Sequence, residues 1–130
     1  MPSDPIRVIV PEANRKAYER GHFAPAVEHE GLVFVSGCVG RGESVEEEYR
    51  DAWRQVGAVL AEAGCGYEDI LESTLYMVDL QANTDTMFKV KDEFIKEPYS
   101  ATTWIGITEL AVPGGRAEIK VTARKPRTQS

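Results

Sequence analysis

Short stretches of apolar or alternating apolar and polar residues run through both halves of the chain, as they do in β-strands. In the N-terminal half, this pattern predicts strands over residues 6–10, 24–29 and 32–35. A turn at residues 30–31 joins the last two strands as a β-hairpin. Residues 12–24 are polar and mixed, and we expect an irregular lead-in there.

Two longer segments carry apolar residues at three- and four-residue spacings, which predicts amphipathic helices. The first begins after Ser44, a residue type that caps helix N-termini, and ends at Gly64. The second begins at Asn83 or Thr84 and is stopped by Pro98. The apolar face of the first helix consists of Val45, Tyr49, Ala52, Trp53, Val56, Leu60 and Ala63.

Three further strands are predicted over residues 73–80, 102–108 and 117–124. The order β-β-β-α-β-α-β-β predicts an α+β fold, with two helices packed on one face of a mixed sheet. The 130 residues form a single domain, with its core over residues 21–124 and a polar tail, residues 125–130, that we expect to be frayed. The other face of the sheet is left bare, which predicts contact with another copy of the chain.

Composition narrows the classes of function. The net charge is −6 and the pI is about 5.0, whereas nucleic acids and anionic membranes need concentrated positive charge, so neither is expected as a partner. Cys38 and Cys65 form no CxxC pair, which disfavours a metal cluster and a disulfide. We find no signal-peptide pattern and no apolar run of membrane-spanning length. We therefore expect a cytoplasmic protein with reduced thiols.

The loops offer little chemistry of their own. His22 has no partners at the spacing of a Ser-His-Asp triad, and His29 lies between two glutamates, as a solvated residue would. The glycines of residues 37–42 do not match a phosphate-binding loop. Cys38 has no base or helix N-terminus beside it in the sequence, which favours a structural thiol over a nucleophile.

Two of the predicted strands carry the residues of most interest. On the last strand, Glu118 lies on a polar face that solvent would ordinarily cover; burial between two copies of the chain would instead suit it as a general base. On the strand before it, no residue of 99–108 is charged. There Thr102 shares a face with Trp104, and Thr103 faces the other way.

Four stretches, taken in order, resemble the RidA/YjgF family and, within it, the YjgH branch. They are HFAPAVEHEGLVFVSGCVG, VLAEAGCGYEDILESTLYMVDL, VKDEF and EIKVTA, and the similarity runs from about Gly21 to Ala123. The resemblance implies a chorismate-mutase-like fold and a homotrimer, with three sheets in a central barrel and ligand clefts between subunits. It also implies hydrolysis of reactive imines and enamines, such as 2-aminoacrylate, to a 2-oxo acid and ammonia, with no metal or other cofactor.

The resemblance also assigns roles to residues. Glu118 matches the family's glutamate, which positions or activates water and is the expected catalytic residue. The arginine that holds the substrate carboxylate in the family is absent; its position falls on Thr102, or on Thr103 if the register slips by one. Arg41 and Arg116 are the nearest candidates to replace it. The expected substrate-binding residues are Phe23, Ser36, Gly37, Cys38, Thr102, Thr103 and Trp104.

Loss of the arginine disfavours 2-imino acids and favours a neutral or aromatic ligand, walled by Phe23 and Trp104. The sequence therefore predicts a small-molecule site between subunits, with hydrolytic deamination of imines, enamines or related metabolites as its reaction. The alternative is a trimer that binds a small molecule or a protein without catalysis. Ribonuclease activity, also linked to the family, is disfavoured by the acidic charge.

Overall fold

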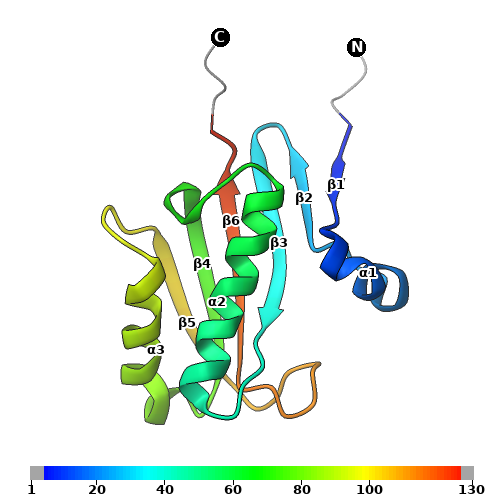
Figure 1. Ribbon diagram of the computed structural model, residues 1–130. Coiled ribbons are helices and arrows are strands. Elements are labelled where there is room, and N and C mark those ends of the chain that lie inside the picture. Colours follow the sequence, from blue (N-terminus) through cyan, green and yellow to red (C-terminus); the bar gives the residue numbers. More distant parts are fainter. Residues whose placement is uncertain (1–4, 127–130) are drawn as a thin grey trace.

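The computed structural model describes residues 5–126 and shows a mixed sheet flanked by helices (Figure 1). Its six strands lie in the order β1-β2-β3-β6-β4-β5. Neighbouring strands are antiparallel, except that β4 and β5 are parallel. The strands are β1 (Arg7–Ile9), β2 (Ala26–His29), β3 (Leu32–Val39), β4 (Ile70–Val78), β5 (Ala101–Ile107) and β6 (Ala117–Arg124).

Helices α2 (Val45–Glu62) and α3 (Leu80–Phe94) cover one face of the sheet, which confirms the predicted α+β architecture (Figure 1). A third helix, α1 (Arg15–Gly21), lies beside the β1 edge. Short 3-10 turns occupy Glu12–Asn14 and Tyr67–Asp69. The core lies between the sheet and the two covering helices, and its largest fully buried side chains are Trp53, Tyr49, Leu60, Leu75, Met77, Met87 and Ile119.

Local sequence signals account for the placement of α2. The Ser44 hydroxyl oxygen accepts a hydrogen bond of 3.1 Å from the Glu47 backbone N–H, so Ser44 is the N-cap, as predicted. After the helix, Gly64 adopts a φ of +84°, which a glycine does without strain. Gly40 serves close packing instead, because a Cβ there would overlap the Glu48 carbonyl oxygen. The chain can therefore cross directly over α2 where β3 ends.

Several predicted boundaries were wrong. The lead-in over residues 12–24 contains α1, which buries none of its residues and so carries no apolar stripe. α3 begins at Leu80 rather than at the predicted asparagine or threonine, because Asp79, with a φ of +54°, turns the chain straight from β4 into the helix. β3 continues to Val39, so Cys38 lies within the strand and not after it.

The first residue of the predicted tail is held by the fold. The Lys125 backbone N–H donates to the Gly31 carbonyl oxygen at 2.8 Å, and its ammonium group contacts the Glu28 carboxylate at 3.2 Å. Residues 127–130 of that tail lie outside the described residues.

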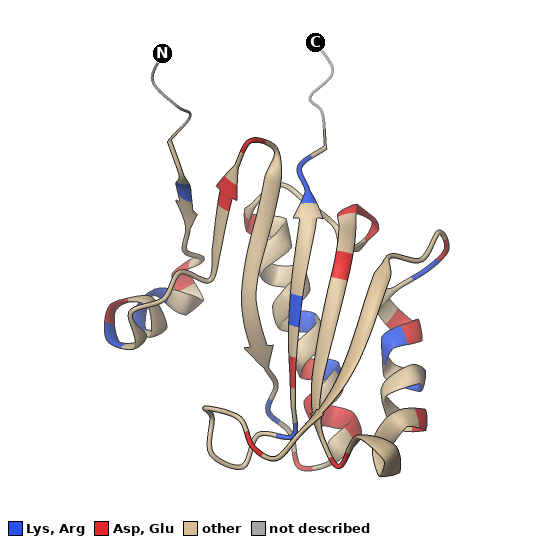
Figure 2. Cartoon of the chain, turned by 180° about the vertical axis from the view of Figure 1, so that it is seen from behind, with Lys and Arg blue, Asp and Glu red and all other residues tan. Residues whose placement is uncertain are grey.

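The second face of the sheet is bare in the described part of the chain. Figure 2 shows this face from behind, with no helix over it and few charged residues along its strands. Leu32, Phe34 and Ile105 are 36%, 43% and 38% exposed there. A monomer would leave these apolar side chains in water, so the face has the character of a contact surface.

Candidate functional site

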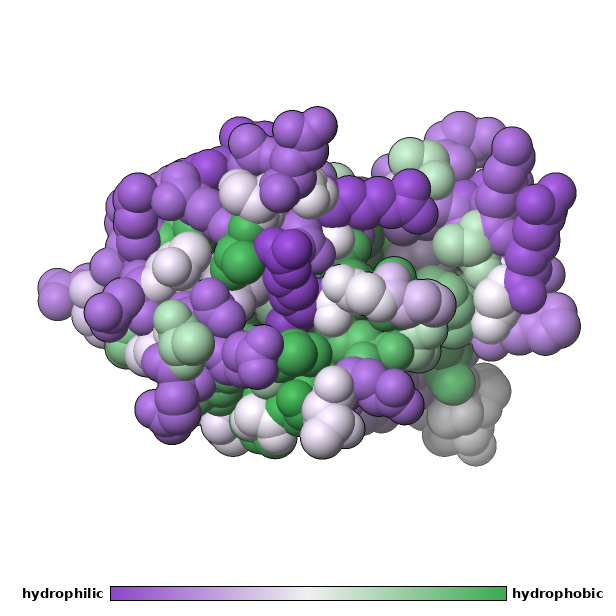
Figure 3. Space-filling view, turned by 90° about the horizontal axis from the view of Figure 1, so that it is seen from below, coloured by the Kyte–Doolittle hydropathy of each residue, from purple (hydrophilic) through white to green (hydrophobic). Residues whose placement is uncertain are grey.

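A cleft of about 460 Å³ opens beside β3, between α1, α2 and the loop of residues 108–116 that joins β5 to β6. Figure 3 views the molecule from below and shows apolar surface near the middle, with a recess toward the α1 side. The cleft is lined by five of the predicted site residues, Phe23, Ser36, Gly37, Cys38 and Glu118. The rest of the lining is mainly apolar (Ala17, Pro25, Val39, Val59, Ala111 and Val112), with two neutral polar residues, Asn14 and Gln55.

Glu118 reaches the cleft through a space that a glycine leaves open. It pairs with Val39 in the antiparallel ladder of β6 and β3, beside a bulge in β3 between Val35 and Cys38. Within the bulge, a Cβ on Gly37 would lie 2.6 Å from Cγ of Glu118 and 2.7 Å from its Oε2. The absence of a side chain at Gly37 thus makes room for the carboxyl group, and Glu118 is half-buried.

The side chains of Ser36 and Cys38 both donate hydrogen bonds to backbone carbonyl oxygens of the protein. The Ser36 hydroxyl donates to the Ala24 carbonyl oxygen at 2.7 Å, and the Cys38 thiol donates to the Ser36 carbonyl oxygen at 3.6 Å. Burial raises the pKa of the Cys38 thiol to about 12, and the charge of Glu118 contributes to the rise. Cys38 is therefore a neutral thiol at physiological pH and not a thiolate nucleophile.

Gln55 of α2 is a cleft residue that the sequence did not reveal. Its amide nitrogen donates to the Val39 carbonyl oxygen at 3.0 Å and to Oδ2 of Asp51 at 2.9 Å. Asp51 Oδ2 also accepts from the Arg41 backbone N–H at 2.8 Å. Because both hydrogens of the Gln55 amide are used, its carbonyl oxygen is what remains for a ligand. A glutamine beside the apolar face of a helix looks like a surface residue in the sequence, so no signal marked it.

The predicted site residues of β5 lie outside this cleft. β4 separates β5 from β6, which places β5 about 10 Å from β6 across the sheet. Thr103 shares the bare face with Glu118, whereas Thr102 and Trp104 pair with strand residues that face the helices. Trp104 packs against Phe88 there, with ring centroids 4.8 Å apart. A single chain therefore does not bring these β5 residues to Glu118.

Arg41 and Arg116, the two candidates to replace the family's carboxylate-binding arginine, do not line the cleft. Arg116 Nε lies 3.1 Å from a carboxylate oxygen of Glu48, whose side chain is only 12% exposed, so this arginine is paired to α2. Arg41 contacts Asp51 through its backbone. Among the described residues that line the cleft, Glu118 is the charged one.

Metal binding and membrane insertion find no support in the described residues. Within residues 5–126, no group of three His, Cys, Asp or Glu side chains is arranged to hold a metal ion. Over the same range, each helix is too short or too polar to cross a bilayer.

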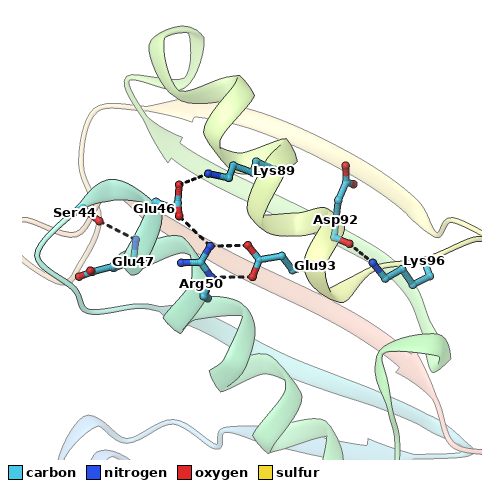
Figure 4. Close-up of polar contacts among 8 residues, drawn as sticks. All are labelled: Ser44, Glu46, Glu47, Arg50, Lys89, Asp92, Glu93 and Lys96. Carbon is cyan, nitrogen blue, oxygen red and sulfur yellow. Dashed lines mark hydrogen bonds and ion pairs between the residues drawn. The ribbon is translucent and has the colours of Figure 1, made fainter.

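A cluster of ion pairs joins α2 to α3 away from the cleft (Figure 4). Arg50 donates to the two carboxylate oxygens of Glu93 at 2.8 and 2.6 Å and to Glu46 at 3.0 Å. The Lys89 ammonium adds a contact of 2.9 Å to Glu46. Hydrogen bonds from Lys89 and Arg50 lower the pKa of Glu46, and the bond from Arg50 lowers the pKa of Glu93. These groups bind one another, so we assign the cluster a role in stability.

Comparison with known proteins identifies the family. The family model described as endoribonuclease L-PSP matches residues 14–125. A solved structure described as protein YjgH superposes with a TM-score of 0.84 at 31% identity, covering 93% of this chain and 97% of that one. The chain belongs to the RidA/YjgF family. The family and fold predicted from the sequence are thus confirmed.

Individual relatives extend the comparison. The RutC family protein YjgH of Escherichia coli (strain K12) is 34% identical over 125 residues, covering 91% of this chain and 94% of the relative. Rv2704 of Mycobacterium tuberculosis, described as a YjgF/YER057c/UK114 family member, superposes with a TM-score of 0.81 at 25% identity, over 91% of this chain and 98% of that one. The human 2-iminobutanoate/2-iminopropanoate deaminase is 24% identical over 111 residues, covering 79% of this chain and 80% of the relative.

Proposed function

We propose that the chain is a hydrolytic deaminase of small imines or enamines, with its sites in clefts between the subunits of a homotrimer. In the reaction, water adds to the carbon of the C=N bond, a C–O bond forms, and the C–N bond then breaks. Both hydrogens of the water end on nitrogen, which leaves as ammonia while the carbon becomes a carbonyl. The chemistry needs a group that first accepts a proton and then returns one.

The proposal rests on the Glu118 carboxyl group, which is half-buried over Gly37 in a cleft whose other described lining residues are neutral. A carboxylate placed there accepts a proton from the attacking water and passes it to the departing nitrogen. Cys38 remains a thiol and does not compete as a nucleophile. The human and bovine relatives, which are named imine deaminases, support the same reaction class.

The bare face of the sheet supports the trimer. Leu32, Phe34 and Ile105 are apolar and partly exposed on it, so association with other copies would bury them. Within one chain, Thr103 lies two strands away from Glu118. We propose that Thr103 of a neighbouring copy completes each cleft. The family's arginine falls on Thr103 if the register slips by one, and unlike Thr102 this residue lies on the bare face.

Mixing two inactive variants tests this arrangement. Glu118→Gln removes the carboxylate from one side of the cleft, and Thr103→Phe fills the other side. Each variant alone should release no ammonia from freshly generated imines above the spontaneous rate. Trimers reassembled from an equal mixture should regain about one quarter of the wild-type rate, because a quarter of the clefts then combine two intact sides.

A mixture of Glu118→Gln with Glu118→Ala serves as the control and should stay inactive. If the mixture of Glu118→Gln and Thr103→Phe also stays inactive while the wild type turns over, the site lies within one subunit. If the wild type releases no ammonia from any imine, the chain is not a deaminase, and binding without catalysis replaces the proposal.

A further inference from the structure

The charge that the described lining residues bring to the cleft is negative. Glu118 is its charged lining residue, and the remaining lining residues are neutral. Arg116, which directly precedes β6, is paired with Glu48 on α2. A ligand carboxylate would therefore meet a like charge with no cation to offset it, whereas a ligand cation would meet its counter-ion.

The hydrogen bonds made by the lining residues also favour a ligand that donates hydrogen bonds. The hydroxyl of Ser36, the thiol of Cys38 and the amide hydrogens of Gln55 are all donated to protein oxygens. What these side chains still offer is acceptors: the Ser36 oxygen and the Gln55 carbonyl oxygen, beside the Glu118 carboxylate. The Asn14 amide, which can donate or accept, does not discriminate between ligands.

The rest of the wall suits an apolar body that carries a positive charge. Phe23 lines the cleft with a side chain that is 45% exposed, and an aromatic face attracts cations. On the bare face of β5, which a neighbouring copy would bring to the cleft, the residues are Ala101, Thr103, Ile105 and Ile107. These are also uncharged, so closure by that strand adds no cation for a carboxylate.

We infer that the cleft takes a cationic nitrogen on an apolar body, namely a protonated imine or amine that has no carboxylate. The inference deepens the proposed function and rests on it, because it names the substrates of the same cleft: imines derived from amines rather than 2-imino acids. Glu118 then has two uses. It holds the positive nitrogen as a counter-ion, and it handles the water that attacks the adjacent carbon.

Equilibrium binding tests the ligand class without any turnover. Benzylamine, benzyl alcohol and phenylacetate present the same ring with a positive, neutral or negative group. At pH 7 the wild type should bind benzylamine at least tenfold more tightly than benzyl alcohol, and phenylacetate should not bind. Glu118→Gln should abolish the preference for the amine and leave the binding of benzyl alcohol unchanged.

The matched control is Glu72→Gln, which removes the same charge from the bare face of β4 but outside the cleft lining. This variant should keep the preference, which excludes a general effect of net charge. Tight binding of phenylacetate, or benzylamine binding that survives Glu118→Gln, would overturn the inference.

Rates of ammonia release from two kinds of imine distinguish a failure of the inference from a failure of the proposed function. A flavin-dependent amine oxidase acting on benzylamine supplies an imine without a carboxylate, and a flavin-dependent amino acid oxidase acting on phenylalanine supplies a 2-imino acid. Accelerated ammonia release from the first alone supports both proposals. Acceleration with the 2-imino acid alone keeps the deaminase and overturns the inference. Amine binding without any acceleration keeps the cationic ligand class and overturns the deaminase.

Discussion

Gly37 and Glu118 share one space between β3 and β6: the position of a Cβ on Gly37 lies 2.6 Å from Cγ of Glu118 and 2.7 Å from its Oε2. The bulge of β3 thus lies beside the one charged residue among the described lining of the cleft. The shared space also distinguishes Glu118 from Lys120. Both side chains lie on the same face of β6, but Lys120 is exposed and lies outside the cleft lining. The position of the Glu118 carboxyl group depends on the missing side chain at Gly37.

Gly37→Ala should displace the Glu118 carboxyl group, because the new methyl group needs the space that the carboxyl group occupies. We expect ammonia release to fall at least tenfold, and the free energy of unfolding to fall by about 1–3 kcal/mol, as for other overpacked sites. Gly106→Ala is the control, since its Cβ would meet only Leu80 Cβ at an ordinary 3.6 Å. A wild-type rate in Gly37→Ala would show that Glu118 does not need its present position.

Gly57→Ala should destabilise the protein, although alanine is ordinarily the better helix former by about 1 kcal/mol. The Tyr67 hydroxyl donates to the Trp53 carbonyl oxygen at 2.7 Å, and the Tyr67 ring lies against the helix at Gly57. A Cβ there would come within 2.6 Å of Tyr67 Cζ, so the ring must move and the hydrogen bond is lost. Urea denaturation should show a lower midpoint for Gly57→Ala, and an equal or higher midpoint would contradict this packing.

Arg50→Gln should lower the stability at pH 7, and the loss should shrink as the pH falls below the ordinary glutamate pKa of about 4.3. The pKa values of Glu46 and Glu93 are lowered in the folded protein by their contacts with Lys89 and Arg50. Their stabilising contribution is therefore complete above the ordinary glutamate pKa of about 4.3 and is lost as the pH falls through the folded values. Urea midpoints of wild type and variant, measured across this range, should converge in acid. A difference that stays constant as the pH falls would assign Arg50 a role other than these ion pairs.

Ile105→Asp should prevent assembly of the proposed trimer, because it places a charge on the apolar bare face of β5. Light scattering coupled to size-exclusion chromatography should give the mass of three chains for the wild type and less for the variant. Gln81→Asp adds the same charge on the exposed surface of α3 and should leave the mass unchanged. A monomeric wild type would remove the basis for clefts between subunits.

The fold was largely predictable because most of its elements bury one periodic face. The apolar spacing from Val45 to Leu60 and the cap at Ser44 predicted α2 within a residue or two of its observed bounds. The helix α1 buries nothing and was missed for that reason. Leu80 lies in α3 rather than at the end of a strand, because the abrupt turn at Asp79 leaves no mark in the hydrophobic pattern.

The site was predictable only in part. Resemblance to a family selected Phe23 and Glu118, and the structure places both on one cleft. Gln55 was missed, because its role depends on hydrogen bonds to Val39 and Asp51 that form only once α2 packs against β3. The prediction groups the residues of β5 with Glu118 in a cleft between subunits. Within one chain these residues lie two strands apart, so the grouping depends on a neighbouring copy and stays a prediction.

Whether Glu118 handles water is best measured by the rate of ammonia release from imines generated in situ, compared among wild type, Glu118→Gln and Glu72→Gln. The account predicts acceleration by the wild type and by Glu72→Gln, and a rate for Glu118→Gln that falls at least a hundredfold, as for the loss of a general base. Acceleration by Glu118→Gln equal to that of the wild type would contradict the assignment of Glu118 as the group that handles water.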